Sequence, residues 1–256
     1  MLWTAFDQRL LDARNKYAYP LVYLEALRQD PAGNYIPIPA AQPKPFLDDW
    51  ESLHTERLRS HEPLQALLGL ASIAYWGFYS GALNNSRNTP ARALVRAAWA
   101  ANGRPKARRK HPGPAGVQAA LQAAARHLAG GDISAAIRSV ATLPEFGQLS
   151  FASKVLTAMS FERCGVYDRV VSKALHAGQL HELAISANSG GVTVRKSDIY
   201  KEWCDLATTR AAEMNAHGRE RGWNYHGNQQ RAWRAVDVER AFFQDRDVRL
   251  LAQAGT

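Results

Sequence analysis

Residues 143–171 read LPEFGQLSFASKVLTAMSFERCGVYDRVV, which joins a proline, a glycine-containing turn, an apolar periodic run and one aspartate. The preceding run, GDISAAIRSVATL over residues 131–143, has apolar residues at helical spacing, with Asp132 placed to cap the helix. Pro144 should end this helix, because proline disfavours a helical conformation at the residue before it. We therefore expect a helix over 133–143 and a turn directly after it.

After the turn, apolar side chains return at intervals of three and four residues and predict a second helix: Phe151, Val155, Leu156 and Met159. The whole unit is a predicted helix-hairpin-helix. Its turn leaves the first N–H groups of the second helix without intrahelical partners, so they can hold an anion such as a DNA phosphate. Phe146, Gly147 and Gln148 are the expected contacts. An ordinary helical hairpin without a ligand fits the same pattern.

The run Tyr167-Asp168-Arg169-Val170-Val171 begins the next predicted helix, and Asp168 follows Gly147 by 21 residues. With this spacing, the stretch resembles the helix-hairpin-helix DNA glycosylases, in particular the bacterial branch similar to 8-oxoguanine DNA glycosylases. The resemblance extends more weakly to Tyr75-Trp76-Gly77-Phe78 and to the C-terminal helices, and so to most of residues 60–250. It implies an all-α fold in which two helical subdomains flank a cleft for DNA and a base.

Two positions depart from that family. Glu145 stands where the hairpin has its first glycine, and Leu149 stands where members that cleave the strand carry a lysine. The nearest lysine is Lys154, five residues further along the helix, or about 500° of rotation. Phosphate binding by this hairpin should therefore be weaker, and a direct replacement of the missing lysine is not assured.

Two mechanisms remain open, and we favour the first. An ionised Asp168 stabilises the positive charge that grows on the sugar and orients a water for attack. Alternatively, a Lys154 amine freed of its proton by burial attacks the sugar and forms an imine. Asp168 also fits a plain helix N-cap, and Lys154 also fits a phosphate contact or a solvated helix residue. Arg169 fits a phosphate or surface role.

A glycosylase needs side chains that line a base pocket and a side chain that fills the gap left by the flipped base. Aromatic and polar residues suit both roles. The candidates are Asn84, Asn85, Arg87, Trp76, Trp223, Phe242 and Phe243. Trp76, Phe242 and Phe243 equally fit core positions, and the run from Gly222 to Gly227 equally fits a surface loop.

A formal charge of +9 and a pI near 9.8 predict a polyanionic partner, with double-stranded DNA favoured over a membrane surface. The excess charge is concentrated between residues 92 and 111, which contain no acidic residue. The expected DNA contacts there are Arg92, Arg96, Arg104, Lys106, Arg108, Arg109 and Lys110. A solubilising linker is the alternative interpretation.

Only Cys164 and Cys204 occur, without a Cys-x-x-Cys pair or a histidine cluster, so we expect no metal, iron-sulfur cluster or other cofactor. Neither a long apolar run nor a signal peptide is present, which predicts a protein of the cytoplasm. With DNA as the expected partner, we also expect it to be nucleoid-associated, and we expect a monomer.

Apolar spacing predicts eleven helices, near 2–15, 46–59, 63–80, 90–101, 115–129, 133–143, 149–160, 168–177, 179–188, 197–217 and 229–244. We expect an N-terminal helical subdomain (1–102) containing a proline-rich loop (30–45) with a short extended piece at Tyr35-Ile36. A basic linker (103–116) should follow, then the helix-hairpin-helix region (117–190) and C-terminal helices (191–256) that pack back on the cleft.

The resemblance implies a DNA glycosylase that flips out a modified base and hydrolyses its N-glycosidic bond. Repair of an oxidised purine and excision of modified bases from phage DNA, as antiviral defence, both fit such a site. The alternatives are a non-catalytic helix-hairpin-helix DNA-binding module and a helical scaffold for other proteins.

Overall fold

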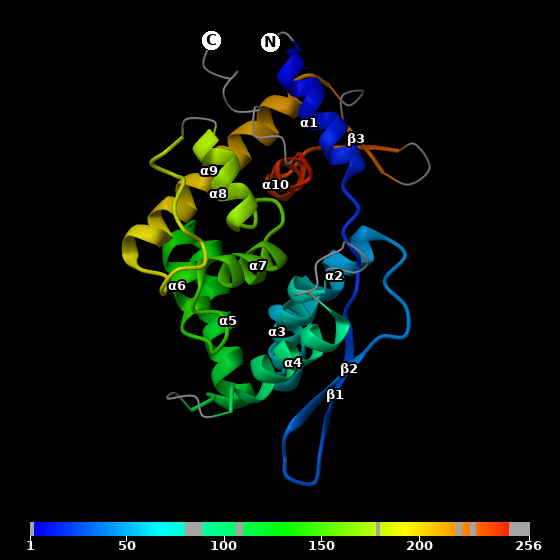
Figure 1. The fold of residues 1–256 in the computed structure, drawn as a ribbon, viewed down its shortest axis with the longest axis vertical. Helices are drawn as coiled ribbons and strands as arrows, with labels where there is room; N and C mark the ends of the chain where they lie inside the picture. The colour runs from blue at the N-terminus through cyan, green and yellow to red at the C-terminus, as the bar shows by residue number, and fades with distance from the viewer. Residues whose placement is uncertain are drawn as a thin grey trace.

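The fold is given by a computed structural model that describes residues 3–79, 89–105, 110–177, 180–218, 222–225 and 229–245. Within these ranges the chain forms ten helices and two small hairpins (Figure 1). The helices are α1 (Ala5–Lys16), α2 (Leu47–Leu58), α3 (Pro63–Phe78), α4 (Pro90–Asn102), α5 (Gly113–Ala129), α6 (Ile133–Ala141), α7 (Leu149–Met159), α8 (Arg169–Ala177), α9 (Val194–Asn215) and α10 (Ala235–Gln244). The strands are β1 (Leu24–Gln29), β2 (Tyr35–Pro39), β3 (Trp223–Asn224) and β4 (Gln230–Arg231).

The expected all-α class is confirmed at the level of a mostly helical chain, whereas the specific helix-hairpin-helix glycosylase fold remains a prediction. Ten of the eleven expected helices are present, with ends shifted by up to six residues. The predicted cap also forms, because the Asp132 side chain accepts a hydrogen bond from the Ala135 N–H at 2.8 Å at the start of α6.

The prediction of a helix over 179–188 is wrong. Residues 180–188 form turns instead, because their backbone groups bond to side chains from other elements. The Tyr167 hydroxyl donates to the Leu183 carbonyl and accepts from the Ile185 N–H, and the Ser172 hydroxyl donates to the Ile185 carbonyl at 2.7 Å. Leu183 and Ala187 are buried by this arrangement, so the segment keeps its apolar contacts without helical hydrogen bonds.

Two hairpins appear where the sequence predicted loop or helix. β1 pairs with β2 in antiparallel register, so the extended piece expected at Tyr35-Ile36 is one strand of a hairpin. The Asp30 carboxylate accepts from the Ala32 and Asn34 N–H groups and closes the turn between these strands. β4 pairs with β3 and replaces the start of the helix expected over 229–244, which begins only at Ala235.

Helix α3 lies inside the core and is surrounded by other helices. Every residue from Ala66 to Tyr75 is buried, as expected for a helix surrounded by protein, and α3 packs on α2, α4, α5 and α7. Near the other end of the molecule, α1 packs on α10, which also contacts α8 and α9 (Figure 1). The first and last helices therefore lie together, and α10 is brought beside α8. In the described ranges, no helix is both long and apolar enough to cross a bilayer.

Candidate functional site

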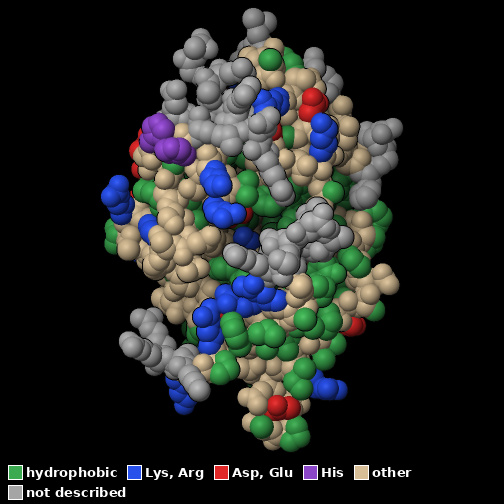
Figure 2. Space-filling view, viewed as in Figure 1, with side chains coloured by type: hydrophobic (Ala, Val, Ile, Leu, Met, Phe, Trp, Pro, Cys, Tyr) green, Lys and Arg blue, Asp and Glu red, His purple; other side chains and the backbone are tan. Residues whose placement is uncertain are grey.

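The predicted catalytic residues lie where α7, the start of α8 and α10 approach one another. Figure 2 shows a hollow near the middle of this face, in the region where Figure 1 places α7 and α10, with Lys and Arg side chains around it. Two ionisable side chains act electrostatically on Glu239 of α10: Asp168, before α8, and Lys154 of α7. We call these three residues the acid–lysine cluster.

Asp168 is held by the first turn of α8. Its Oδ1 accepts hydrogen bonds from the Val170 N–H at 2.7 Å and the Val171 N–H at 3.0 Å. These N–H groups and the helix dipole stabilise a negative charge at this position. Asp168 is thus an N-cap, as one interpretation of the sequence held, but the cap is half-buried beside two other ionisable groups.

Lys154 lies against the last turn of α3. A β-carbon on Gly77 would come within 2.9 Å of Lys154 Cδ, so the glycine leaves the space through which the lysine stem passes. Its Nζ donates to the Ser150 carbonyl at 3.3 Å and lies 5.8 Å from the Phe151 ring centroid. Leu149, which stands in the position of the missing lysine, is fully buried. Lys154, by contrast, is half-buried, and its charge acts on Glu239, as does that of Asp168.

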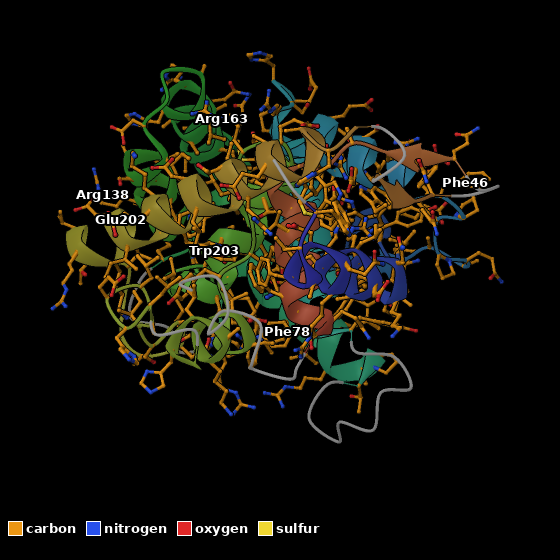
Figure 3. All side chains as sticks on the ribbon, turned by 90° about the horizontal axis from the view of Figure 1, so that it is seen from above. Phe46, Phe78, Arg138, Arg163, Glu202 and Trp203 are labelled. Atoms are coloured by element: carbon orange, nitrogen blue, oxygen red, sulfur yellow. The ribbon has the colours of Figure 1, made fainter. Side chains whose placement is uncertain are left out.

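Glu239 was not identified from the sequence. It is 5 % exposed, and its Cβ would lie 3.0 Å from a β-carbon on Gly165, which therefore allows α10 to approach the α7–α8 connection. Burial, and secondly the Asp168 carboxylate, raises the pKa of Glu239 to about 8 from an ordinary value of 4.5. The side chain of α9 that faces Gly165 is the uncharged Trp203, seen inside the molecule in Figure 3, where Glu202 lies at the surface.

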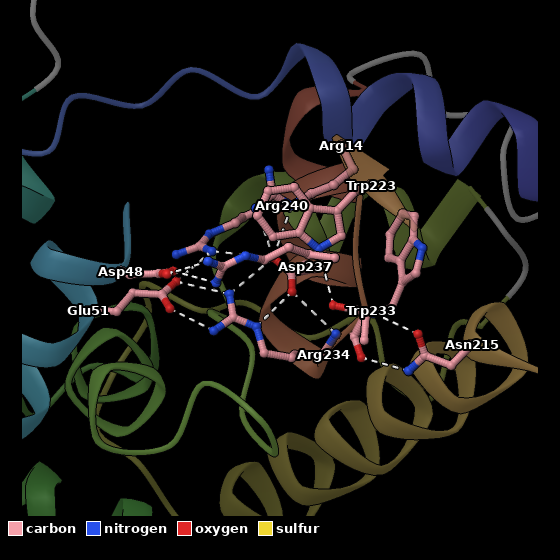
Figure 4. Close-up of polar contacts among 11 residues, drawn as sticks. Arg14, Asp48, Glu51, Asn215, Trp223, Trp233, Arg234, Asp237 and Arg240 are labelled. Carbon is pink, nitrogen blue, oxygen red and sulfur yellow. Dashed lines mark hydrogen bonds and ion pairs between the residues drawn. The ribbon is translucent and has the colours of Figure 1, made fainter. Parts of the chain in front are cut away.

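A network of buried ion pairs fixes α10 to the rest of the molecule (Figure 4). Asp237 accepts from Arg14 of α1 at 2.8 Å and from Arg234 at 2.8 Å. Glu51 of α2 accepts from Arg234 at 2.6 Å and pairs with Arg240 at 2.8 Å. These three arginines, Arg234 above all, hold the pKa of Asp237 well below its usual range, although burial alone would raise it. Because Arg240 is engaged by Glu51, it does not neutralise the adjacent Glu239.

Aromatic side chains line the space next to the acid–lysine cluster. Phe243, one turn after Glu239 on α10, lies 6.2 Å from both Tyr17 and Tyr19 between ring centroids, edge to face. Tyr19 lies 5.2 Å from Trp76, and its pKa is raised by burial and by the Asp168 carboxylate. We call Tyr17, Tyr19, Trp76 and Phe243 the aromatic wall. All four are half-buried, so each presents some surface for a flat ligand.

Sequence reasoning identified Trp76 and Phe243 but missed the two tyrosines. Tyr17 and Tyr19 follow α1 and reach the site only because α1 packs on α10. The one available signal for Glu239 was its i, i+4 spacing to Phe243, which places both side chains on the same face of a helix.

The hairpin adopts a strained turn at Glu145. This residue has φ 72°, in the left-handed region that favours glycine, which costs about 1–2 kcal/mol for other residues. The Glu145 side chain is 7 % exposed, and its carboxylate pairs with Arg96 at 3.1 Å. It also accepts two hydrogen bonds from Arg104, one from Nε and one from Nη2 at 2.9 Å. The ion pairs offset the strain, and they turn the negative charge of Glu145 toward two arginines of this protein.

Arg96 and Arg104 were expected to bind DNA, but the structure places both against Glu145. The Arg96 guanidinium also lies 4.3 Å from the Phe78 ring centroid, and Phe78 stacks on Phe151 at 4.7 Å between centroids. With Lys154 beyond Phe151, these side chains form a column that runs from Arg96 of α4 to the acid–lysine cluster.

The start of α7 is partly covered by the segment after α8. The Ser150 N–H, expected to face outward, donates to the Ala187 carbonyl at 3.3 Å. The Gln148 side chain donates to the Asn188 carbonyl at 2.9 Å, and the Val192 N–H donates to the Gly147 carbonyl. In the described part of the chain, the N–H groups of residues 147–149 have no acceptor. The predicted anion site is thus restricted to these three groups.

The remaining predicted residues divide into three groups. Arg92, Arg169 and Lys110 are exposed, as a phosphate contact requires. The Phe146 N–H, which was predicted to hold a phosphate, donates instead to the Leu143 carbonyl at 3.1 Å. The side chains of Trp223 and Phe242 are 3 % and 4 % exposed and belong to the core rather than to a base pocket. Trp223 lies beneath Arg14, whose Cζ is 3.7 Å from the ring centroid, and donates to the Ala232 carbonyl. Outside the described residues lie Asn84, Asn85, Arg87, Lys106, Arg108 and Arg109.

In the part of the chain that the structure describes, no three side chains of metal-ligand type converge. Comparison with known protein families found no matching family model, and comparisons with curated proteins and with solved structures found no match.

Proposed function

We propose that this protein is a DNA glycosylase that flips a modified base out of the duplex and breaks its N-glycosidic bond. One observation carries the proposal: the cap aspartate of α8 is grouped with Lys154 and a buried Glu239 directly beside the aromatic wall. A carboxylate that can stabilise a sugar cation and a set of rings that can stack on a base are the two requirements of this chemistry.

Asp168 is assigned the central role. Both of its hydrogen bonds to helix N–H groups go to Oδ1, so Oδ2 is the oxygen that can face a sugar or a water. As the bond from the sugar C1′ to the base nitrogen breaks, its electron pair leaves with the base and positive charge grows on the sugar. The carboxylate stabilises this charge, and it accepts a proton from the water that then adds to C1′.

The aromatic wall supplies the free energy for base flipping. Extrusion of a nucleotide costs a few kcal/mol of unstacking, which stacking on aromatic side chains recovers. Phe243 and Tyr19 stand edge to face, so a base stacked on one ring presents its edge to the other. We assign the neighbouring Glu239 to the base side of the site, and Asp168 and Lys154 to the sugar side.

Exposed cationic side chains around the hollow bind the phosphates of the DNA backbone. Arg169 begins α8 directly after Asp168, and Lys173 follows it by one turn on the same face. Together with the N–H groups of residues 147–149, these two side chains are the groups that we propose to contact the phosphates. This arrangement predicts sequence-independent DNA binding that weakens steeply as salt rises.

An imine mechanism is the second candidate, and the position of Lys154 favours it. Its stem passes the gap left by Gly77, and its charge acts on Glu239 across the site. In this mechanism the neutral Lys154 amine attacks C1′ in place of water, and the base leaves with the electron pair of the broken bond and takes one amine proton. The C1′–O4′ bond then breaks, and the second amine proton passes to O4′, which gives the imine. Borohydride would trap the imine as a covalent complex with DNA, which Lys154→Ala should abolish.

The substrate class that we propose is the one that the resemblance implies. An oxidised purine such as 8-oxoguanine, or a bulky base of phage DNA, requires the same carboxylate and the same rings. The site therefore serves repair or antiviral defence according to the base it accepts, acting in the cytoplasm on double-stranded DNA.

The test uses Asp168→Asn, which keeps the cap but removes the charge. We expect this variant to bind duplex DNA like the wild type and to release no base from duplexes containing 8-oxoguanine or from modified phage DNA. Asp132→Asn is the matched control, because Asp132 is also an N-cap aspartate and should retain full base release. Equal base release by the Asp168 variant, or none by the wild type on the whole panel, would overturn the proposal; the latter result would favour a non-catalytic DNA-binding module.

A further inference from the structure

Glu239 has a position that the proposed roles of Asp168 and Lys154 do not explain. It is buried at 5 % exposure on the face of α10 that also carries Phe243, one turn later. Gly165 and Trp203 close the space behind it. No ion pair joins Glu239 to Lys154 or to any other cation in the described ranges. An unpaired buried carboxyl is costly to the fold, which points to a use in function.

Four charged side chains, from α1, α7, α10 and the start of α8, act on Glu239. Asp168, at the start of α8, opposes its ionisation, whereas Arg240 of α10, Lys154 of α7 and Arg14 of α1 favour it. Tyr17, after α1, is a further titratable neighbour, and burial raises the pKa of its phenol. From α9, the side chain that packs beside Gly165 next to Glu239 is the uncharged Trp203.

The balance of these groups leaves Glu239 protonated at neutral pH. Its pKa lies at about 8, because burial and the Asp168 carboxylate outweigh the three cations. Of these cations, Arg240 pairs with Glu51 and Arg14 pairs with Asp237. The Asp168 carboxylate sits at a helix N-terminus that stabilises its charge. The site therefore pairs a neutral acid on one side with a carboxylate on the other, which is how one site separates acid and base roles.

We propose that Glu239 is the general acid that protonates the departing base. This inference rests on the proposed glycosylase function. As the C1′–N bond breaks, its electron pair moves onto the base, and a ring nitrogen or oxygen of the base takes the proton of the Glu239 carboxyl. The carboxyl becomes a carboxylate, the base leaves neutral, and the sugar cation is captured by water or by the Lys154 amine. Asp168 and Glu239 thus act on opposite ends of one bond.

The placement of the rings supports this division. Phe243 and Glu239 share one face of α10, so a base stacked at Phe243 lies alongside the carboxyl. Asp168 reaches the site from α8, on the side of the exposed Arg169, where a DNA backbone is expected. A proton donor beside the base and an anion beside the sugar both lower the barrier to bond breaking, and a positioned acid typically contributes about 10²–10⁴-fold in rate.

The experiment measures single-turnover base release from a duplex with one 8-oxoguanine, and from modified phage DNA, between pH 6 and pH 9.5. For the wild type we expect a rate that falls as pH rises through about 8, because only the protonated carboxyl donates. Glu239→Gln, which has the same shape but no acidic proton, should be slower by about 100-fold or more at pH 7. Its residual rate should no longer fall in that pH range.

Binding affinity separates catalysis from recognition. Because glutamine is nearly isosteric, the dissociation constant for the duplex should change less than about threefold, and the loss should appear in the rate. Glu239→Gln with an unchanged rate would overturn the proposal. A variant that binds the modified duplex weakly but keeps the wild-type pH profile would also overturn it, because the carboxyl would then serve only to recognise the base.

Glu202→Gln, on the exposed face of α9, is the control and should match the wild type in rate and pH profile. A failure of this inference is distinct from a failure of the proposed function. In the first case the wild type releases base, Asp168→Asn does not, and Glu239→Gln is as active as the wild type. In the second, the wild type itself releases no base.

Discussion

Replacing Glu239 with glutamine should stabilise the folded protein as pH rises, although it removes a residue assigned to the reaction. In the folded protein, burial and the Asp168 carboxylate raise the pKa of Glu239 to about 8, against 4.5 for an exposed glutamate. Between these values the folded state holds a proton that the unfolded state has lost. The stability that this proton contributes is complete below pH 4.5 and is lost as pH rises through about 8.

The magnitude follows from the two pKa values. At 1.36 kcal/mol for each pH unit between them, the folded wild type loses about 3 kcal/mol by pH 7 and about 4 to 5 kcal/mol by pH 8.5. Glutamine cannot ionise, so the variant avoids this loss. The difference in the free energy of unfolding between Glu239→Gln and wild type should therefore grow from about 1 kcal/mol at pH 5 to about 4 to 5 kcal/mol at pH 8.5.

Urea unfolding at pH 5, 7 and 8.5 measures this difference from the transition midpoint at unchanged slope. Glu202→Gln should follow the wild type at every pH, because that side chain is exposed. If Glu239→Gln and wild type change in parallel from pH 5 to 8.5, the Glu239 carboxyl ionises freely in the folded protein. The argument that it is kept protonated by burial would then be refuted.

Three further substitutions test other parts of the structure. Asp237→Asn removes the shared partner of Arg14 and Arg234 and should lower the free energy of unfolding by about 3–5 kcal/mol in urea; a loss under 1 kcal/mol would contradict the role given to this network. Gly77→Ala places a β-carbon 2.9 Å from Lys154 Cδ and should lower the single-turnover rate of base release. The free energy of unfolding should stay level or rise by up to about 1 kcal/mol. An unchanged rate would show that the lysine side chain need not pass there. Glu145→Gly relieves the strained turn and releases Arg96 and Arg104, so duplex binding by fluorescence anisotropy should tighten at low salt, with a salt slope steeper by about one unit for each new phosphate contact; an equal or shallower slope would contradict this.

The helices could be predicted because their signals are local. Apolar spacing of three and four residues and an N-cap aspartate at residue 132 or 168 need no knowledge of the rest of the chain. The segment 180–188 has helical apolar spacing as well, but the Tyr167 and Ser172 hydroxyls, brought to it by the fold, take its backbone groups. A distant hydrogen-bond partner overrides a local preference there.

For the same reason, only some residues of the candidate site could be predicted from the sequence. Asp168 and Lys154 lie close together along the chain, so both were identified from the motif region. Glu239 and the tyrosines of the aromatic wall come from opposite ends of the chain and meet because α1 packs on α10. Glu145 shows the same limit, because the sequence placed its charge beside a phosphate, whereas the folded chain provides two arginines for it.

The most direct test of the central claim is the identity of what the protein releases from DNA. Wild type, Asp168→Asn and Asp132→Asn are incubated with duplexes carrying single modified bases and with phage genomes, and released bases are identified by mass spectrometry. The account predicts one class of free base from wild type and Asp132→Asn and none from Asp168→Asn. Release of the same base by Asp168→Asn, or no release by the wild type, would contradict it.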